Sequence, residues 1–316
     1  MAHDEPNLRQ PAWKLQGWLE RALSAMLCAR EASHSDGHTA AEGHQSRKEG
    51  MSRPELQCDN KTRALWISRS NPRRDMSLRM FCFPYAGASA AVYQDWQRYL
   101  PAEVDLCLVH LPGRGSRLAE PCCQSVDEVM MGLMPELLPL LDRPFVLYGH
   151  SMGALLAFVA ARRLRQHHAL LPVQLMVSSS SAPQIPNVYP PLHTLPDREF
   201  IHAIIRLNGT PTEILENDDC MSLMLPIMRA DFGICNRYEY SPEAPLACPI
   251  SVFGGIADTT VAEERLEAWR QQTSSDFSLQ MFPGDHFFLR SAQRIFLGEV
   301  VRKLQLLCSS GRQFRH

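Results

Sequence analysis

The stretch Phe145-Val146-Leu147-Tyr148-Gly149-His150-Ser151-Met152-Gly153-Ala154 decides the fold expected for this chain. Its apolar opening predicts a buried strand, and residues 154–161 are good helix formers. Between strand and helix stands a serine flanked by two glycines, which is the G-x-S-x-G pattern of a nucleophile elbow. A Cβ at either glycine would meet the neighbouring backbone, so glycine leaves room for a sharp turn. Ser151 is therefore a candidate nucleophile beside the N-terminus of a helix.

The five-residue pattern alone also fits a glycine-rich turn with a bystander serine, so the rest of the chain has to decide. Asp258 follows a predicted strand over residues 249–255, and His286 follows another over residues 277–282. A serine becomes nucleophilic when an imidazole takes its proton, and a carboxylate fixes the tautomer of that imidazole. Sites in parallel sheets gather at the C-terminal ends of strands, and the order Ser, Asp, His is that of an α/β-hydrolase. We therefore predict Ser151, Asp258 and His286 as a catalytic triad.

Other titratable residues are less suitable for these roles. Asp285 adjoins His286, and neighbours on an extended loop point apart. His150 precedes the nucleophile, and its side chain is expected to point away from it. Asp231 lies in the predicted helical cap, and His110 ends an earlier predicted strand, so both are expected to be structural.

A loop of mostly small residues, 84–89, follows a predicted strand over residues 78–83. Such a loop can bring a backbone N–H close to a reacting carbonyl. In α/β-hydrolases one oxyanion donor comes from this early loop and the other from the residue after the nucleophile. The expected donors are Ala86, or its neighbour Gly87, and Met152. A plain strand-to-helix turn is the alternative for the early loop.

Strands and helices alternate from residue 78 onward, which predicts a mostly parallel sheet covered by helices on both faces. Residues 184–246 break the alternation with clustered prolines and helical segments, and we predict an inserted helical cap there. The α/β-hydrolase domain is expected to span residues 76–310. The predicted strands are residues 78–83, 105–110, 145–148, 173–178, 249–255 and 277–282.

Residues 1–75 differ from the rest and are expected to form an N-terminal extension. Apolar residues recur at helical spacing over residues 12–30, which predicts an amphipathic helix. Residues 33–50 have no periodicity and are rich in His, Ser, Gly and Glu, as in a linker. The extension could serve as a docking arm, pack on the domain or be untranslated sequence ahead of Met51; an accessory or spurious extension is favoured over a functional arm.

The composition is 45% hydrophobic and 21% charged, with a formal net charge of −2, and gives no argument for nucleic-acid binding. Ten cysteines without C-x-x-C or metal-ligand spacing fit a reducing compartment, so we expect a cytoplasmic protein without metal or organic cofactor. No apolar run approaches the roughly 20 residues that span a bilayer.

Five motifs in order resemble the type II, stand-alone thioesterases of polyketide and non-ribosomal peptide synthetases, which are α/β-hydrolases. They are Phe81-Cys82-Phe83-Pro84-Tyr85-Ala86-Gly87, Leu111-Pro112-Gly113-Arg114-Gly115, Gly149-His150-Ser151-Met152-Gly153, Leu225-Pro226-Ile227-Met228-Arg229-Ala230-Asp231-Phe232 and Phe282-Pro283-Gly284-Asp285-His286-Phe287-Phe288. The resemblance covers about residues 78–304 and departs from the family at Ala88, where a second glycine is frequent, and at Thr259, where proline is frequent.

The resemblance implies hydrolysis of acyl groups from the phosphopantetheine arms of carrier proteins, by a monomer that uses Ser151, His286 and Asp258. Two alternatives remain at this stage. A carboxylesterase would use the same triad on oxygen esters. A non-catalytic α/β-hydrolase relative would bind a ligand or partner, although such proteins usually lack a triad member.

Overall fold

The computed structural model describes residues 66–70, 76–186, 191–207 and 217–313. The predicted amphipathic helix over residues 12–30 and the linker after it lie outside the described residues. So do short pieces of the predicted cap, at residues 187–190 and 208–216.

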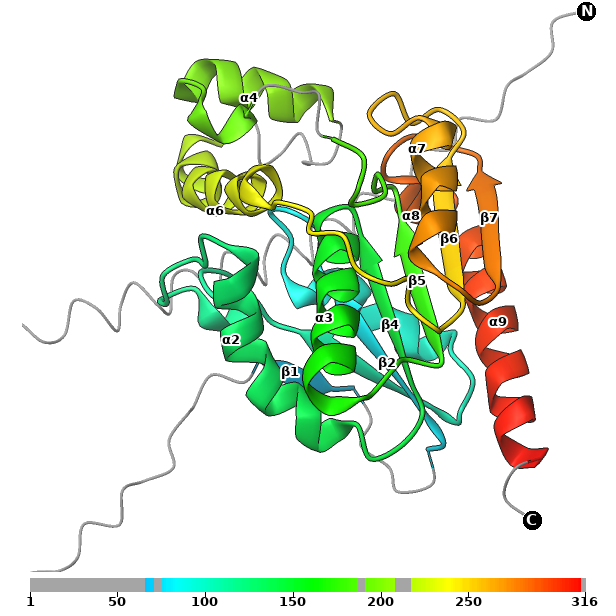
Figure 1. Cartoon of the computed structure of the whole chain (residues 1–316). Helices are drawn as coiled ribbons and strands as arrows, with labels where there is room; N and C mark the ends of the chain where they lie inside the picture. Colours follow the sequence, from blue (N-terminus) through cyan, green and yellow to red (C-terminus); the bar gives the residue numbers. More distant parts are fainter. Residues whose placement is uncertain (1–65, 71–75, 187–190, 208–216, 314–316) are drawn as a thin grey trace, which may run out of the picture. The chain divides into compact units, whose positions relative to one another are not determined.

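A seven-stranded sheet in the order β1-β3-β2-β4-β5-β6-β7 forms the centre of the domain (Figure 1). All neighbouring strands run parallel except β1, which pairs antiparallel with β3. The predicted α/β-hydrolase fold is confirmed. The strands are β1 (Ile67–Arg69), β2 (Leu78–Phe83), β3 (Val104–Val109), β4 (Phe145–His150), β5 (Gln174–Ser178), β6 (Ile250–Gly255) and β7 (Phe277–Phe282).

Strand β1 lies in the part of the chain that the sequence analysis placed in the N-terminal extension. Ile67 pairs with Val109 at the edge of the sheet, and Trp66 N–H donates to a carboxylate oxygen of Glu136 at 2.8 Å. Three residues are too few to produce the alternating pattern by which a strand is predicted. The sheet therefore begins before residue 76.

Helices cover both faces of the sheet. One face packs against α2 (Val126–Leu137), α3 (Met152–His168), α7 (Glu263–Glu267) and the 3-10 helix η5 (Ala268–Gln272). The other face packs against the 3-10 helix η1 (Ala90–Arg98), α8 (Phe288–Ser291) and α9 (Gln293–Gln313). Two short 3-10 turns, η2 (Gly115–Arg117) and η3 (Leu138–Leu140), lie in the connections.

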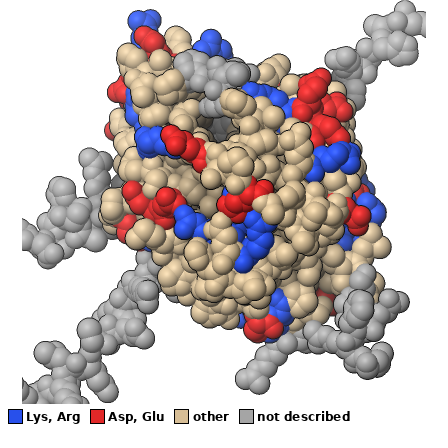
Figure 2. Space-filling model, viewed as in Figure 1, with Lys and Arg blue, Asp and Glu red and all other residues tan. Residues whose placement is uncertain are grey.

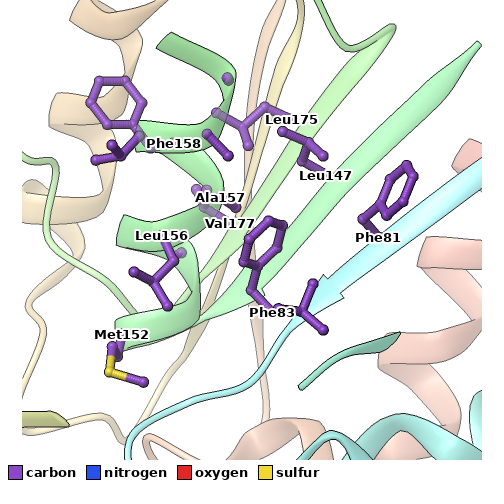
Figure 3. Close-up of a cluster of buried hydrophobic side chains, with 14 of the residues drawn as sticks. Phe81, Phe83, Leu147, Met152, Leu156, Ala157, Phe158, Leu175 and Val177 are labelled. Carbon is purple, nitrogen blue, oxygen red and sulfur yellow. The ribbon is translucent and has the colours of Figure 1, made fainter. Parts of the chain in front are cut away.

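Figure 3 shows apolar side chains of the strands packed against those of helix α3 on the first face of the sheet. Helix α3 starts at the predicted elbow. Phe83, Leu147 and Val177 come from three neighbouring strands and are almost fully buried, together with Leu156 and Ala157 of the helix. Apolar burial of this kind contributes about 25 cal/mol per Å². The start of α3 is thereby fixed against the strand ends that carry the candidate site.

The cap consists, in its described part, of η4 (Leu192–Thr194), α4 (Asp197–Arg206) and α6 (Asp218–Arg237). Its two helices lie together beyond the ends toward which the strands point (Figure 1). Phe200, Ile204 and Met228 form a small core of their own between the cap helices. The cap thus stands over the edge of the sheet where Ser151, Asp258 and His286 were predicted to meet.

On the face shown in Figure 2, Lys and Arg side chains alternate with Asp and Glu side chains and gather into no single basic area. Within the described residues, no helix combines the length and the apolar character that crossing a membrane requires.

Candidate active site

Ser151 occupies a strained turn between β4 and α3. Its backbone angles are φ 53° and ψ −120°, a combination that side-chain-bearing residues rarely adopt and that costs about 1–3 kcal/mol. Ser151 N–H donates to Ser178 O on the adjacent strand at 2.8 Å, and Ala154 N–H donates to Ser151 O at 3.0 Å. These bonds on both sides hold the turn in its strained form.

The two glycines of the motif stand where backbone segments touch. A Cβ at Gly149 would lie 2.0 Å from Gly153 O, and a Cβ at Gly153 would lie 2.2 Å from Phe83 O. Phe83 ends strand β2, next to β4 in the sheet. The turn at Ser151 is therefore pressed directly against the start of the small-residue loop at 84–89.

Asp258 and His286 are hydrogen-bonded, with His286 Nδ1 2.9 Å from Asp258 Oδ2. The other carboxylate oxygen, Oδ1, accepts from Thr260 N–H at 2.8 Å, from Thr260 Oγ1 at 2.6 Å and from Val261 N–H at 3.2 Å. Burial raises the pKa of Asp258, but hydrogen bonding to His286 and Thr260 and the His286 charge outweigh it, so the pKa lies well below its ordinary value. Asp258 is therefore ionised and fixed.

This pairing sets the tautomer of His286. With Nδ1 donating to the Asp258 carboxylate, Nε2 remains as the proton acceptor of the neutral ring. Thr260 Oγ1 lies 2.9 Å from the same Nδ1 and is a second oxygen contact of this nitrogen. The residue is only 9% exposed, so the imidazole is largely shielded from water.

The His150 ring connects the turn at Ser151 with the Asp258–His286 pair. Its ring lies 5.2 Å, centroid to centroid, from the ring of His286, and it directly precedes Ser151 in the chain. The His150 side chain is fully buried, and its Nδ1 lies 2.8 Å from Ser178 Oγ. Burial, together with the nearby His286 charge, lowers the pKa of His150 well below its ordinary value. It is a neutral, structural ring beneath the site.

The predicted oxyanion loop forms a tight turn from Tyr85 to Ala88, closed by Ala88 N–H donating to Tyr85 O at 3.0 Å. Gly87, at the third position, has φ +76°, as a type II turn requires. Gly87 N–H donates to Asp231 Oδ2 at 2.7 Å, so it already has an acceptor. Of the two N–H groups predicted in this loop, that of Ala86 is the better candidate. Ala88 needs no glycine, since its φ is not positive.

Met152 is the first residue of α3, where backbone N–H groups have no acceptor within the helix. Its N–H therefore lies at the positive end of the helix dipole, beside Ser151. Because β2 and β4 are neighbours, with Phe83 opposite Gly149, the loop holding Ala86 and the turn holding Met152 leave the sheet side by side.

Sequence reasoning missed Thr260 and the contacts of Arg114. The spacing Asp-x-Thr could have indicated Thr260, because an Asp side chain often accepts from the backbone two residues later. Arg114 pairs with Asp231, 117 positions away, and no local pattern reveals a partner at that separation. Asp285, the sequence neighbour of His286, accepts a hydrogen bond from Phe287 N–H at 2.8 Å.

Comparison with known proteins gives one consistent result. A family model described as "Thioesterase domain" matches residues 78–306. The gramicidin S biosynthesis protein GrsT of Aneurinibacillus migulanus is 41% identical over 242 residues, which cover 77% of this chain and 94% of that protein. The solved RedJ thioesterase from the prodiginine pathway of Streptomyces coelicolor has a TM-score of 0.69 at 36% identity, covering 72% of this chain and 90% of its own. The type II thioesterase BorB of the borrelidin cluster has a TM-score of 0.69 at 32% identity, covering 75% and 96%.

Proposed function

The chain belongs to the thioesterase family, a group of serine hydrolases with the α/β-hydrolase fold, and from this membership we propose that it hydrolyses acyl groups from the phosphopantetheine arms of synthetase carrier proteins. In this role it would clear stalled or wrongly loaded intermediates from a polyketide or non-ribosomal peptide synthetase. The names of the relatives GrsT, RedJ and BorB assign them to gramicidin S, prodiginine and borrelidin biosynthesis, respectively.

The proposal assigns Ser151 as nucleophile, His286 as general base and acid, and Asp258 as the carboxylate that orients His286. The observation that carries it is the 2.9 Å hydrogen bond from His286 Nδ1 to Asp258 Oδ2. It leaves Nε2 as the base, on a ring in contact with the residue that precedes Ser151. The strained turn at Ser151 is a second support, because such strain is found where function requires it.

In the first half of the reaction, Ser151 Oγ attacks the thioester carbonyl carbon while His286 Nε2 takes the hydroxyl proton. The carbonyl oxygen becomes an oxyanion and accepts from the N–H groups of Met152 and Ala86. The C–S bond then breaks, and His286 gives its proton to the departing phosphopantetheine thiolate. The product is an acyl ester on Ser151.

In the second half, water takes the place of the thiol. His286 Nε2 removes a proton from the water as its oxygen attacks the acyl-ester carbonyl, and the same two N–H groups hold the second oxyanion. Collapse returns the proton to Ser151 Oγ and releases the carboxylic acid. Asp258 stays ionised throughout, because it stabilises the imidazolium without taking the proton.

The test compares acyl-carrier thioesters carrying short, long and aminoacyl loads with matched oxygen esters. Hydrolysis of carrier thioesters, lost in Ser151→Ala together with labelling by a fluorophosphonate, supports the proposal. Preference for oxygen esters would indicate a carboxylesterase that uses the same residues. Absence of both labelling and turnover in the parent would reject an enzymatic role for Ser151.

The proposal also has the protein acting in the cytoplasm as a monomer on carrier domains. Seven free thiols lie in the described residues, which suits a reducing compartment; they are those of Cys82, Cys107, Cys122, Cys123, Cys220, Cys235 and Cys248. Every group assigned to the reaction comes from a single chain, so no second copy is needed to complete the site. Light scattering of the purified protein, alone and with a loaded carrier domain, tests the monomeric state.

A further inference from the structure

Asp231 is a fully buried carboxylate in cap helix α6, 80 residues after Ser151 in the chain. Arg114, from the loop after β3, approaches it with both guanidinium ends. Arg114 Nη2 lies 2.8 Å from Asp231 Oδ1, and Arg114 Nη1 contacts Oδ2. Burial lowers the pKa of Arg114, but the neighbouring Asp231 charge and hydrogen bond raise it by more, so the pKa lies above its ordinary value. The two side chains form a charged, two-pronged pair.

The same carboxylate has a third donor, the backbone N–H of Gly87. This bond is 2.7 Å long and reaches from the cap to the tip of the Tyr85–Ala88 turn, across 144 positions of sequence. The contact is close on every side, since a Cβ at Gly87 would lie 3.2 Å from two side-chain atoms of Met228, also in α6. The turn is therefore attached to the cap at its tip and to strand β2 at its base.

A buried ion pair of this kind is a poor choice if stability alone is required. Removing two charges from water is expensive, and well-packed apolar residues of similar volume are often equally stable or more so. What apolar residues could not supply is an acceptor for Gly87 N–H. A carboxylate only accepts hydrogen bonds, so it holds the tip of the turn through this N–H, and the Ala86 N–H, one peptide earlier, is held in position with the tip. Glycine at the third position tolerates φ of either sign, so without this contact the tip of the turn is less constrained.

We propose that Asp231, oriented by Arg114, is a positioning residue that fixes the Ala86–Gly87 turn and so aims the Ala86 N–H at the oxyanion. The inference rests on the proposed function, in which Ala86 is one of two oxyanion donors. Loss of one such donor lowers kcat by about 100- to 1,000-fold in other enzymes. A donor that is displaced but still present is expected to lower kcat by about 30- to 100-fold. The KM for the thioester should change little, because the ground-state carbonyl depends less on this donor.

The decisive variant is the double substitution R114M/D231L, which replaces the charged pair by apolar side chains of similar size. It removes the acceptor of Gly87 N–H while leaving no unpaired charge in the interior. Expected are a melting temperature near that of the parent, a kcat about 30- to 100-fold lower and an unchanged KM. A folded double variant with the parent's kcat would overturn the proposal.

A substitute variant and a matched control complete the test. If the double variant does not fold, R114Q/D231A takes its place, because it also removes the acceptor of Gly87 N–H and leaves no unpaired charge; the same loss in kcat and an unchanged KM are expected. The matched control is E243Q, which breaks another ion pair, to the buried Arg162, without touching the turn. It is expected to lower the melting temperature and leave kcat unchanged; a fall in kcat equal to that of the Asp231 variant would assign the effect to general destabilisation and reject the proposal.

The rate of Ser151 labelling by a fluorophosphonate is measured for all variants. The phosphoryl oxygen of the probe occupies the oxyanion position, so labelling should slow in parallel with kcat in the double variant. This readout needs no carrier substrate. A parent that labels rapidly but ignores carrier thioesters would refute the proposed function, while equal labelling rates in parent and double variant would refute the role of Asp231.

Discussion

Replacing Asp258 by Asn should disable the base while preserving the shape of the site. Oδ1 of Asp258 accepts three hydrogen bonds, two from Thr260 and one from Val261 N–H, whereas Oδ2 faces His286 Nδ1. The amide oxygen of Asn will take the place of Oδ1, because an NH₂ group cannot accept from three donors. The NH₂ group then faces His286 Nδ1 and donates to it. His286 must carry its proton on Nε2, where it cannot remove the proton of Ser151.

The magnitude follows from this forced tautomer. In a Ser-His-Asp triad the Asp-to-Asn exchange that leaves geometry intact lowers kcat by about 10,000-fold. At about 1.36 kcal/mol per factor of ten, this loss corresponds to roughly 5.5 kcal/mol of transition-state stabilisation. The fold should survive, since Asn retains all contacts of Oδ1 with Thr260 and Val261. KM should stay within a few-fold, because Asp258 touches no part of the substrate.

Single-turnover acylation of Ser151 by an acyl-pantetheine thioester, followed by mass spectrometry of the intact protein, measures the effect directly. Thermal unfolding and the far-UV spectrum establish that the variant is folded. A folded Asp258→Asn variant that acylates within about 100-fold of the parent would refute the assignment of Asp258 as the residue that orients His286. Such a result would place the orienting role on Thr260, whose hydroxyl also contacts Nδ1.

Three further predictions concern stability. Ser151→Gly should relieve the φ 53° strain and raise the free energy of unfolding by about 1–3 kcal/mol relative to Ser151→Ala, as urea unfolding will measure; equal values would contradict the strain. Gly153→Ala places a Cβ 2.2 Å from Phe83 O and should cost about 3 kcal/mol or more, whereas Gly298→Ala, exposed in α9 with nothing within 4 Å, should gain about 0.5–1 kcal/mol by the same assay. Because the folded pKa of Asp258 is lowered, its charge stabilises the fold above the unfolded pKa of about 4, and the stability advantage of the parent over Asp258→Asn should shrink as the pH falls below that value toward the lower folded pKa; a pH-independent difference would show that the carboxylate charge contributes nothing.

The sequence predicted the parts of this molecule whose signals are local. The turn at Ser151 is specified within about 17 residues. This one stretch contains the apolar strand, the glycines at 149 and 153 and the helix-forming residues, so all the signals for the turn are local. The apolar runs of β2 to β7 predicted six of the seven strands. Asp258 and His286 could be predicted as neighbours because parallel strands end at one edge of a sheet, and the structure places His286 Nδ1 2.9 Å from Asp258 Oδ2.

The missed features are those in which the partner lies far away or the element is very short. Strand β1 has three residues and is held in the sheet by its antiparallel pairing with β3. The donors to Asp231 come from positions 114 and 87, and nothing in either stretch identifies a carboxylate in the cap as the acceptor. Likewise η1 (Ala90–Arg98) is a 3-10 helix, and hydrophobic spacing indicates which face of a helix is buried but not its exact pitch.

The proposed nucleophile and oxyanion donors leave different strands from the proposed base and its carboxylate, although the rings of His150 and His286 are in contact. The turn at Ser151 and the early loop leave the adjacent strands β4 and β2, while Asp258 and His286 leave β6 and β7. Strand β5 lies between the two pairs and bonds to both, to the Ser151 turn through Ser178 O and to β6 through Ser179 N–H, which donates to Phe253 O at 2.9 Å. The side-chain contacts of Asp231 nevertheless share no residue with those of Asp258, so each set can be altered by substitutions outside the other. Variants of Asp258 should lose proton transfer with the oxyanion site intact, whereas variants of Asp231 should retain a working base beside a displaced donor, so the two losses should multiply in a combined variant.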